Sequence, residues 1–202
     1  MVSVYGLKPR FQNLLRPFCR RLAGAGVTAN QVTIGAAVLS VAAGSAIAAS
    51  RGASWALLLV PPVLFVRMAL NAIDGMLARE FNQKSRLGAI LNELGDVVSD
   101  TALYLPFALI DGVSPALVGL LVAIAVMTDT TGVVAVMIGS SRRYDGPFGK
   151  SDRAVFFGAL ALLLGFGVHA GLWTSIVLLL AAAAGCLTIV NRARAALAEG
   201  HT

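Results

Sequence analysis

The sequence predicts an all-α integral membrane protein, with six transmembrane helices preceded by an amphipathic helix on the cytoplasmic membrane surface. Hydrophobic residues make up 57% of the 202 residues and charged residues only 13%, against about 25% charged in soluble domains. A soluble domain of this size has too little interior to bury so much apolar surface. The composition also excludes disordered, collagen-like and disulfide-rich proteins, because the chain is too apolar and has only two Cys.

Six apolar stretches are long enough to cross the hydrocarbon core of a bilayer, which requires about 20 helical residues. Helices are required because lipid satisfies no backbone hydrogen bonds, and the alternating pattern of a transmembrane barrel is not seen. The expected spans are Val32–Ala49, Ser54–Ala78, Leu87–Ile110, Ala116–Ile138, Ala154–Ala170 and Leu172–Val190.

The basic residues predict the orientation of these spans. With this set of spans, 14 of the 16 Lys and Arg residues fall on one side of the membrane, Arg51 falls on the other, and Arg67 lies inside a span. Since cytoplasmic loops are enriched in Lys and Arg, both termini are expected in the cytoplasm, in a bacterial plasma (inner) membrane. The net charge of +6 is therefore a topology signal. Nucleic acid is not an expected partner, because no basic aromatic platform accompanies the charge.

The chain is expected to divide into an N-terminal amphipathic juxtamembrane segment, residues 1–30, and a six-helix transmembrane catalytic domain, residues 31–202. Apolar residues recur at helical spacing in the first segment, with basic residues between them, which is typical of a helix lying on the membrane surface. A helix packed on a protein neighbour is the alternative. The apolar positions are Leu7, Phe11, Leu14, Leu15, Phe18 and Leu22.

Five acids fall inside the predicted spans, where each central acid costs about 2.5–3.5 kcal/mol on insertion scales. An acid in this position is a candidate functional residue. The alternative is pairing with Arg67, Arg79 or a neighbouring span, and for Asp129 this alternative is favoured. The five acids are Asp74, Glu93, Asp96, Asp100 and Asp129.

The spacing of the polar residues places them on two helix faces. Asn71, Asp74, Gly75 and Ala78 stand at i, i+3, i+4 and i+7, and so share one face of the second span. Asn92, Asp96 and Asp100 step by four along the third span. Because the connecting loop is short, the two spans are expected to be antiparallel neighbours. Their facing oxygen atoms suit a hard cation such as Mg²⁺ or Mn²⁺.

These residues carry a resemblance to a known family. The run Asn71-Ala-Ile-Asp74-Gly75-Met-Leu-Ala78-Arg79, followed by Gly88, Asn92 and Asp96, resembles the signature D-x2-D-G-x2-A-R-x8-G-x3-D-x3-D of the CDP-alcohol phosphotransferases. The segment Thr28-Ala-Asn30-Gln-Val-Thr33 is similar to the family's T-P-N-x-x-T, with Ala29 in place of Pro. The resemblance implies a homodimeric enzyme that moves a phosphatidyl-type group from a CDP-lipid to a small alcohol, with release of CMP.

The resemblance also implies roles for the motif residues. Asn71, Asp74, Asn92 and Asp96 match the metal ligands, for Mg²⁺ or Mn²⁺, and Asp96 matches the last acid, which is our choice for the general base. The CDP moiety would be bound by Gly75, Ala78, Arg79 and Gly88.

The sequence departs from the family pattern at the first and third acids, which are Asn71 and Asn92. Asn can ligate a cation through its carbonyl oxygen but brings no charge. Three outcomes are open: Glu93 or Asp100 supplies the missing charge, the site holds one metal ion, or the chain is a non-catalytic relative.

The connection between the fourth and fifth predicted spans, residues 140–153, gathers several basic residues. Arg142, Lys150 and Arg153 are candidates for binding the phosphate of the acceptor or of the lipid, and the resemblance places acceptor contacts here. A phosphorylated acceptor is therefore expected. The alternative is that these basic residues only mark the cytoplasmic side of the membrane and contact anionic lipid headgroups.

Two other functions compete with the transferase. A catalytically degenerate member of the family could act as a lipid-binding or assembly subunit. A small ion-coupled transporter would also use membrane acids, but it predicts an internal repeat, and none is evident in the sequence.

Overall fold

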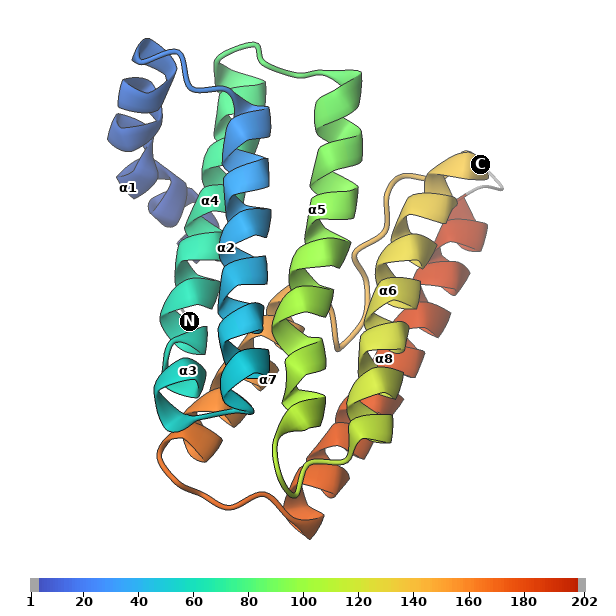
Figure 1. Cartoon of the computed structure of the whole chain (residues 1–202). Coiled ribbons are helices and arrows are strands. Elements are labelled where there is room, and N and C mark those ends of the chain that lie inside the picture. Colours follow the sequence, from blue (N-terminus) through green and yellow to red (C-terminus); the bar gives the residue numbers. More distant parts are fainter. Residues whose placement is uncertain (1–3, 200–202) are drawn as a thin grey trace. The chain divides into compact units, whose positions relative to one another are not determined.

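The computed structural model describes residues 4–199, with side chains from Phe11 onward, and is helical throughout (Figure 1). Leu7, Lys8 and Arg10, which belong to the expected surface-helix pattern, lie outside the described side chains. The α-helices are α1 (Val4–Gly24), α2 (Ala29–Ser50), α3 (Ser54–Leu58), α4 (Val60–Glu80), α5 (Arg86–Tyr104), α6 (Pro115–Met137), α7 (Lys150–Gly165) and α8 (Leu172–Glu199).

The all-α prediction is confirmed, whereas the count of six spans is matched only in part. Within residues 4–199, four segments are long and apolar enough to cross a membrane: α2, the segment Ser54–Glu80 that joins α3 to α4, α6 and α8. The other two predicted spans correspond to α5, which contains four charged residues, and to α7, which has 16 residues. The charged residues make α5 less apolar than the four candidate spans, and α7 is shorter than the roughly 20 residues that cross a bilayer.

Two predicted spans end earlier than expected. The third was predicted to reach Ile110, but α5 ends at Tyr104 and a 3-10 helix, Leu105–Leu109, follows. Pro106 lies at the start of that helix, and its missing N–H ends the α-helical hydrogen bonding. The fifth was predicted to reach Ala170, but α7 ends at Gly165, just before Gly167 with φ +91°.

The chain divides into two compact units. Unit 1 comprises Met1–Ala42 and Pro62–Ser99, and unit 2 comprises Ala43–Pro61 and Asp100–Thr202. Unit 1 therefore contains α1, the first part of α2 and most of α4 and α5, while unit 2 contains α3, α6, α7 and α8.

A small apolar core holds α1 against α2 and α4 in unit 1. It includes Cys19 from α1, Val32 from α2, and Met76 and Leu77 from α4. Phe18 and Leu14, also on α1, are 50% and 75% exposed. One face of this helix thus packs on its own chain, while apolar residues outside that face remain exposed.

Aromatic packing and close backbone contact define the interior of unit 2. Tyr104 stacks on Phe157 with ring centroids 4.0 Å apart, and Phe107 meets the same ring edge-on at 5.2 Å. At Gly44 of α2, a Cβ atom would lie only 1.8 Å from the carbonyl oxygen of Ala102 on α5. Glycine is therefore what allows the two backbones to approach so closely.

Candidate functional site

The polar faces of α4 and α5 meet in unit 1 through Asn71 and Asp96. The Asn71 amide Nδ2 donates to Asp96 Oδ1 at 3.5 Å, which is a long hydrogen bond. The helical spacing predicted from the sequence thus brings the first and last positions of the motif together, although they are 25 residues apart. Asn92 is half-buried on α5, one turn before Asp96.

Asp74 is held by the start of α2. Its carboxylate, in a residue that is 6% exposed, accepts a 2.8 Å hydrogen bond from the Thr33 hydroxyl. The helix turn that presents Thr33 is fixed by a reciprocal cap. The Gln31 backbone donates to Thr28 Oγ1 at 3.3 Å and the Thr28 backbone donates to Gln31 Oε1 at 2.9 Å. The segment resembling T-P-N-x-x-T therefore orients a motif carboxylate.

A buried arginine shares this face of α4. Arg67 is 3% exposed, and its Nη2 lies 3.8 Å from Asp96 Oδ1 and donates to the Asp96 backbone oxygen at 3.4 Å. The sequence left open that an intramembrane acid pairs with Arg67. The structure shows this pairing for Asp96.

The residues expected to contact CDP line the same unit. A Cβ on Gly75 would lie 2.9 Å from Arg79 Nη2, so the exposed arginine folds over the glycine. A Cβ on Gly88 would lie 2.8 Å from Asn30 Oδ1. Ala78 is half-buried against the unit 1 core. Two glycines thus admit polar groups close to the backbone at the motif positions.

Sequence reasoning missed Gln83, which fastens the α4–α5 loop to the beginning of α2. Its Oε1 accepts from the Ala29 backbone at 2.7 Å and its Nε2 donates to the Val27 carbonyl at 3.4 Å. A polar residue in a short loop carries no signal of its partner, so only the fold reveals this contact.

The donor set suits one hard divalent ion better than two. Two carboxylates, Asp74 and Asp96, and two amide carbonyls, Asn71 and Asn92, are the oxygen donors that Mg²⁺ and Mn²⁺ prefer. Across residues 4–199, no three His, Cys, Asp or Glu side chains gather as a metal site. Asn71 and Asn92 stand where the family motif has acids, so only two of its four acidic positions carry a carboxylate in this chain. Asp100, a candidate for the missing charge, accepts hydrogen bonds from Arg153 in unit 2.

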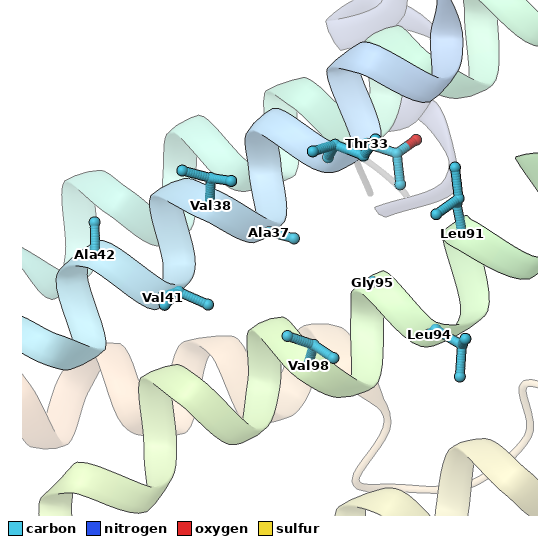
Figure 2. A pocket seen from close by; sticks show the side chains of 10 residues that line it. Thr33, Ala37, Val38, Val41, Ala42, Leu91, Leu94, Gly95 and Val98 are labelled. Carbon is cyan, nitrogen blue, oxygen red and sulfur yellow. The ribbon is translucent and has the colours of Figure 1, made fainter.

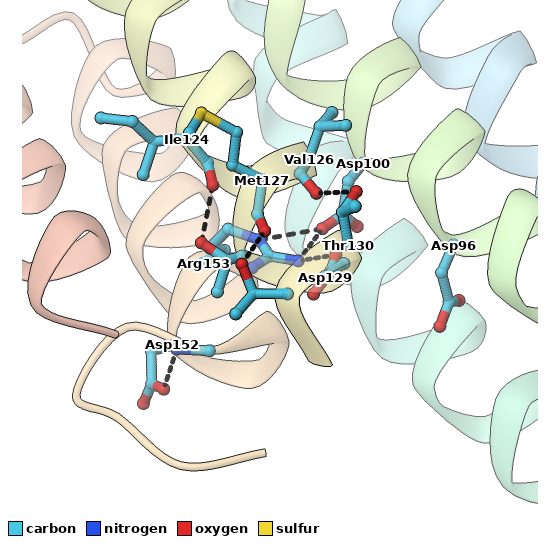
Figure 3. Close-up of polar contacts among 12 residues, drawn as sticks. Asp96, Asp100, Ile124, Val126, Met127, Asp129, Thr130, Asp152 and Arg153 are labelled. Atoms are coloured by element: carbon cyan, nitrogen blue, oxygen red, sulfur yellow. Dashed lines mark hydrogen bonds and ion pairs between the residues drawn. The ribbon is translucent and has the colours of Figure 1, made fainter. Parts of the chain in front are cut away.

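Unit 2 contains a buried ion-pair network centred on Arg153 (Figure 3). This side chain is 1% exposed and donates to Asp100 Oδ2 from Nε and Nη2 at 3.0 and 2.8 Å, and to Asp129 Oδ2 at 2.6 Å. Arg192 Nη1 lies 3.6 Å from Asp129 Oδ1. Asp129 is thus paired, as favoured from the sequence, and its partners lie on neighbouring helices, Arg153 on α7 and Arg192 on α8, rather than being Arg67 or Arg79.

The other basic residues expected to bind phosphate lie in the loop before α7 and at the start of that helix. Arg142 Nη1 donates to the Tyr144 hydroxyl at 3.1 Å, and its guanidinium lies 4.9 Å from the centre of that ring. Lys150 is half-buried at the first position of α7. In the same loop, hydrogen bonding from Arg143 lowers the pKa of Asp145. Of the three candidates for binding phosphate, Arg142 and Lys150 lie in this segment, and Arg153 forms ion pairs with Asp100 and Asp129.

An apolar groove of about 510 Å³ runs between α2 and α5 in unit 1 (Figure 2). It begins at Thr33, the residue that donates to Asp74, and continues along α2 to Ala42 and along α5 to Val98. Apart from Thr33, its lining side chains are apolar. A hydrocarbon surface therefore adjoins a motif carboxylate.

Comparisons with known proteins identify the family of this chain. Residues 26–190 match the family model described as CDP-alcohol phosphatidyltransferase. The inner membrane protein YnbA of Escherichia coli (strain K12) is 44% identical over 196 residues, which cover 97% of each chain.

Solved structures share the fold. The phosphatidylinositol phosphate synthase of Mycobacterium tuberculosis with CDP-DAG bound superimposes with a TM-score of 0.74 at 22% identity, covering 89% of this chain and 92% of that one. A structure of the same synthase with manganese and citrate gives the same TM-score and identity, covering 90% of this chain and 88% of that one. Together with the match to the family model, this establishes that the chain belongs to the CDP-alcohol phosphatidyltransferase family.

Proposed function

We propose that this protein is a metal-dependent transferase of phospholipid biosynthesis. It moves a phosphatidyl-type group from a CDP-lipid, CDP-diacylglycerol, to a small alcohol and releases CMP. The observation that carries the proposal is the contact between the polar faces of α4 and α5 in unit 1, where Asn71 on one helix meets Asp96 on the other.

The motif residues divide the chemistry between them. Asp74, Asp96, Asn71 and Asn92 would hold Mg²⁺ or Mn²⁺, which would neutralise the diphosphate and polarise its oxygens. Asp96 takes the proton of the attacking alcohol. Thr33 keeps the Asp74 carboxylate in one orientation, and Gly75, Ala78, Arg79 and Gly88 receive the CDP moiety.

The apolar groove supports a lipid substrate. Because the groove starts at Thr33 and is otherwise lined by hydrocarbon, an acyl chain lying in it would keep the lipid's headgroup beside Asp74. Apolar burial of this kind contributes about 0.8 kcal/mol per CH₂ group. The lipid tails then need not leave the bilayer during the reaction.

The same proposal includes the membrane arrangement. α5 and α7 complete six spans with the four apolar segments, residues 31–202 form the catalytic domain, and residues 1–30 form a surface helix whose Phe18 side faces the bilayer. Both termini are cytoplasmic, the membrane is the bacterial inner membrane, as the name of the Escherichia coli relative indicates for that protein, and the enzyme is a homodimer.

The acceptor is proposed to be a phosphorylated alcohol contacted by Arg142, Lys150 and Arg153. Arg153 already binds two carboxylates through Nε and Nη2, whereas its buried Nη1 has no hydrogen-bond partner within the described residues, so Nη1 is the donor that a phosphate would meet without displacing a carboxylate. A panel of glycerol phosphate, inositol phosphate and serine separates a phosphorylated acceptor from an unphosphorylated one.

The test is release of CMP from labelled CDP-diacylglycerol by the purified protein, with Mg²⁺ or Mn²⁺ and each acceptor. We expect turnover that chelation abolishes and that Asp96→Asn lowers at least 100-fold, within the usual range for losing a general base. Asp111→Asn, the same change at an exposed acid of unit 2, is the matched control. Equal turnover by the Asp96 and Asp111 variants would reject the proposal.

The two asparagines favour a second candidate, a degenerate family member that acts as a lipid-binding or assembly subunit. Asn71→Asp with Asn92→Asp restores the two acids of the motif. An inactive wild type and an active double variant would support the subunit, whereas an active wild type supports the enzyme.

A further inference from the structure

Arg67 is a buried charge of unit 1 that the proposed chemistry leaves without a role. It lies one turn before Asn71 and two turns before Asp74, on the motif face of α4. A cation that is 3% exposed within an apolar segment is costly to bury, and such residues pair with other groups and mark functional sites. Its guanidinium reaches α5 at Asp96, through both the carboxylate and the backbone oxygen.

The charges on the four proposed metal ligands and on Arg67 favour one divalent ion beside them. Asp74 and Asp96 contribute two negative charges, Arg67 contributes one positive charge, and Asn71 and Asn92 contribute none. One divalent ion turns this formal −1 into +1, which suits a diphosphate. A second divalent ion would raise it to +3 in a partly buried site, where like charges repel strongly.

We propose that Arg67 is a fixed cationic member of this site: it limits the motif to one divalent ion and itself supplies the second positive group for the substrate's diphosphate. The inference rests on the proposed function. Arginine suits this role because its guanidinium keeps its charge at any pH and presents several donors in one plane to phosphate oxygens.

A positioning or structural role for Arg67 gives a different pattern of effects from a cationic role. If Arg67 only supports the packing of α4 on α5, its loss weakens metal binding and turnover together. If Arg67 is a competing cation, its loss relieves repulsion at Asp96, so metal binds more tightly while turnover falls. Opposite changes in these two quantities are therefore diagnostic.

The experiment counts Mn²⁺ ions per full-length chain by electron paramagnetic resonance, in detergent and without CDP-lipid, and measures CMP release separately. We expect one ion per chain for the wild type. Arg67→Gln should bind Mn²⁺ at least tenfold more tightly and release CMP at least tenfold more slowly. Arg67→Lys, which keeps the charge, should stay within threefold of the wild type in Mn²⁺ affinity.

A second variant covers the case in which Arg67→Gln does not fold. Asn92→Asp leaves Arg67 in place and adds a carboxylate, so we expect one ion per chain, bound at least tenfold more tightly. Two ions in the wild type or in this variant, or weaker Mn²⁺ binding by a folded Arg67→Gln, would overturn the inference. The Mn²⁺ results remain interpretable even if no acceptor supports CMP release, so the two proposals fail separately.

Discussion

Each unit holds acids beside a buried arginine, but only the cluster around Arg153 in unit 2 has as many positive as negative charges. There, Asp100 and Asp129 face Arg153 and Arg192, giving a formal charge of zero, and the shortest nitrogen–oxygen distance among them is 2.6 Å. Such a network gains little net stability by forming, but it becomes expensive when one partner is removed.

Unit 1 has the opposite arrangement. It has two motif carboxylates, Asp74 and Asp96, and one buried arginine, Arg67, whose Nη2 lies 3.8 Å from Asp96 Oδ1. The excess negative charge and the longer distance suit binding of a cation that arrives from solution. The comparison therefore predicts that changes in unit 2 act mainly on stability, while changes in unit 1 act mainly on metal binding.

The largest effect is expected at Arg153. Arg153→Met leaves Asp100 and Asp129 buried without their main cation, which should cost about 3–5 kcal/mol in the free energy of unfolding. Denaturant unfolding in detergent measures this cost. Arg194→Met, at an exposed arginine of α8, is the control. Adding Asp100→Asn and Asp129→Asn to Arg153→Met should restore part of the stability, and no restoration would contradict the charge argument.

A smaller loss is expected at Gly44. In Gly44→Ala the new Cβ meets the carbonyl oxygen of Ala102 at 1.8 Å, and separating the two backbones should cost about 1–3 kcal/mol of unfolding free energy. The matched control is Gly35→Ala on the same helix, where nothing lies within 4 Å of the added Cβ. That change should be neutral or stabilising, by up to about 1 kcal/mol. Equal melting temperatures for the two variants would argue against the close approach.

Thr33→Val tests the polar face of unit 1. It removes the 2.8 Å hydrogen bond to Asp74 while keeping the shape of the side chain. Loss of such an outer contact usually costs about 10–100-fold in metal affinity, so we expect Mn²⁺ binding to weaken about tenfold. Thr130→Val is the control, because its hydroxyl donates only to a carbonyl of its own helix. If Thr33→Val lowered the melting temperature strongly and left the Mn²⁺ affinity unchanged, changes in unit 1 would act on stability, contrary to the comparison.

The smallest effect is expected from Asp145 in the loop before α7. Arg143 lowers the pKa of Asp145 through a hydrogen bond, so the folded state favours the ionised acid. This contribution is present above the unfolded pKa of about 3.9 and is lost as the pH falls through the lower folded value. Asp145→Asn should therefore lower the melting temperature slightly at pH 7 and progressively less below pH 4. A difference that grows on acidification would show that the pairing has the opposite effect.

The sequence predicts the helices and one face of each motif helix because these depend on local spacing. Steps of three and four residues place Asn71 and Asp96 on faces that do meet, and Pro106 marks where α5 has to end. What spacing cannot supply is the partner of a side chain on another helix.

The contacts that could not be predicted join residues that are far apart in the sequence. Thr33 and Asp74 are 41 residues apart, and Arg153 and Asp100 are 53 apart. Each depends on the rotation of two packed helices about their axes, which packing of the surrounding side chains determines. Apolar content alone could not show that α7 would be 16 residues long or that Arg153 would turn toward carboxylates.

The burial of Cys19 in unit 1 has a practical consequence for labelling. Its thiol lies 4.0 Å from the Met76 sulfur, and burial raises its pKa, so little thiolate is available to react. The other cysteine, Cys186 of α8, is exposed. A membrane-permeant maleimide dye should therefore attach at a single native position, giving fluorescence experiments a reporter in unit 2 without any engineered cysteine.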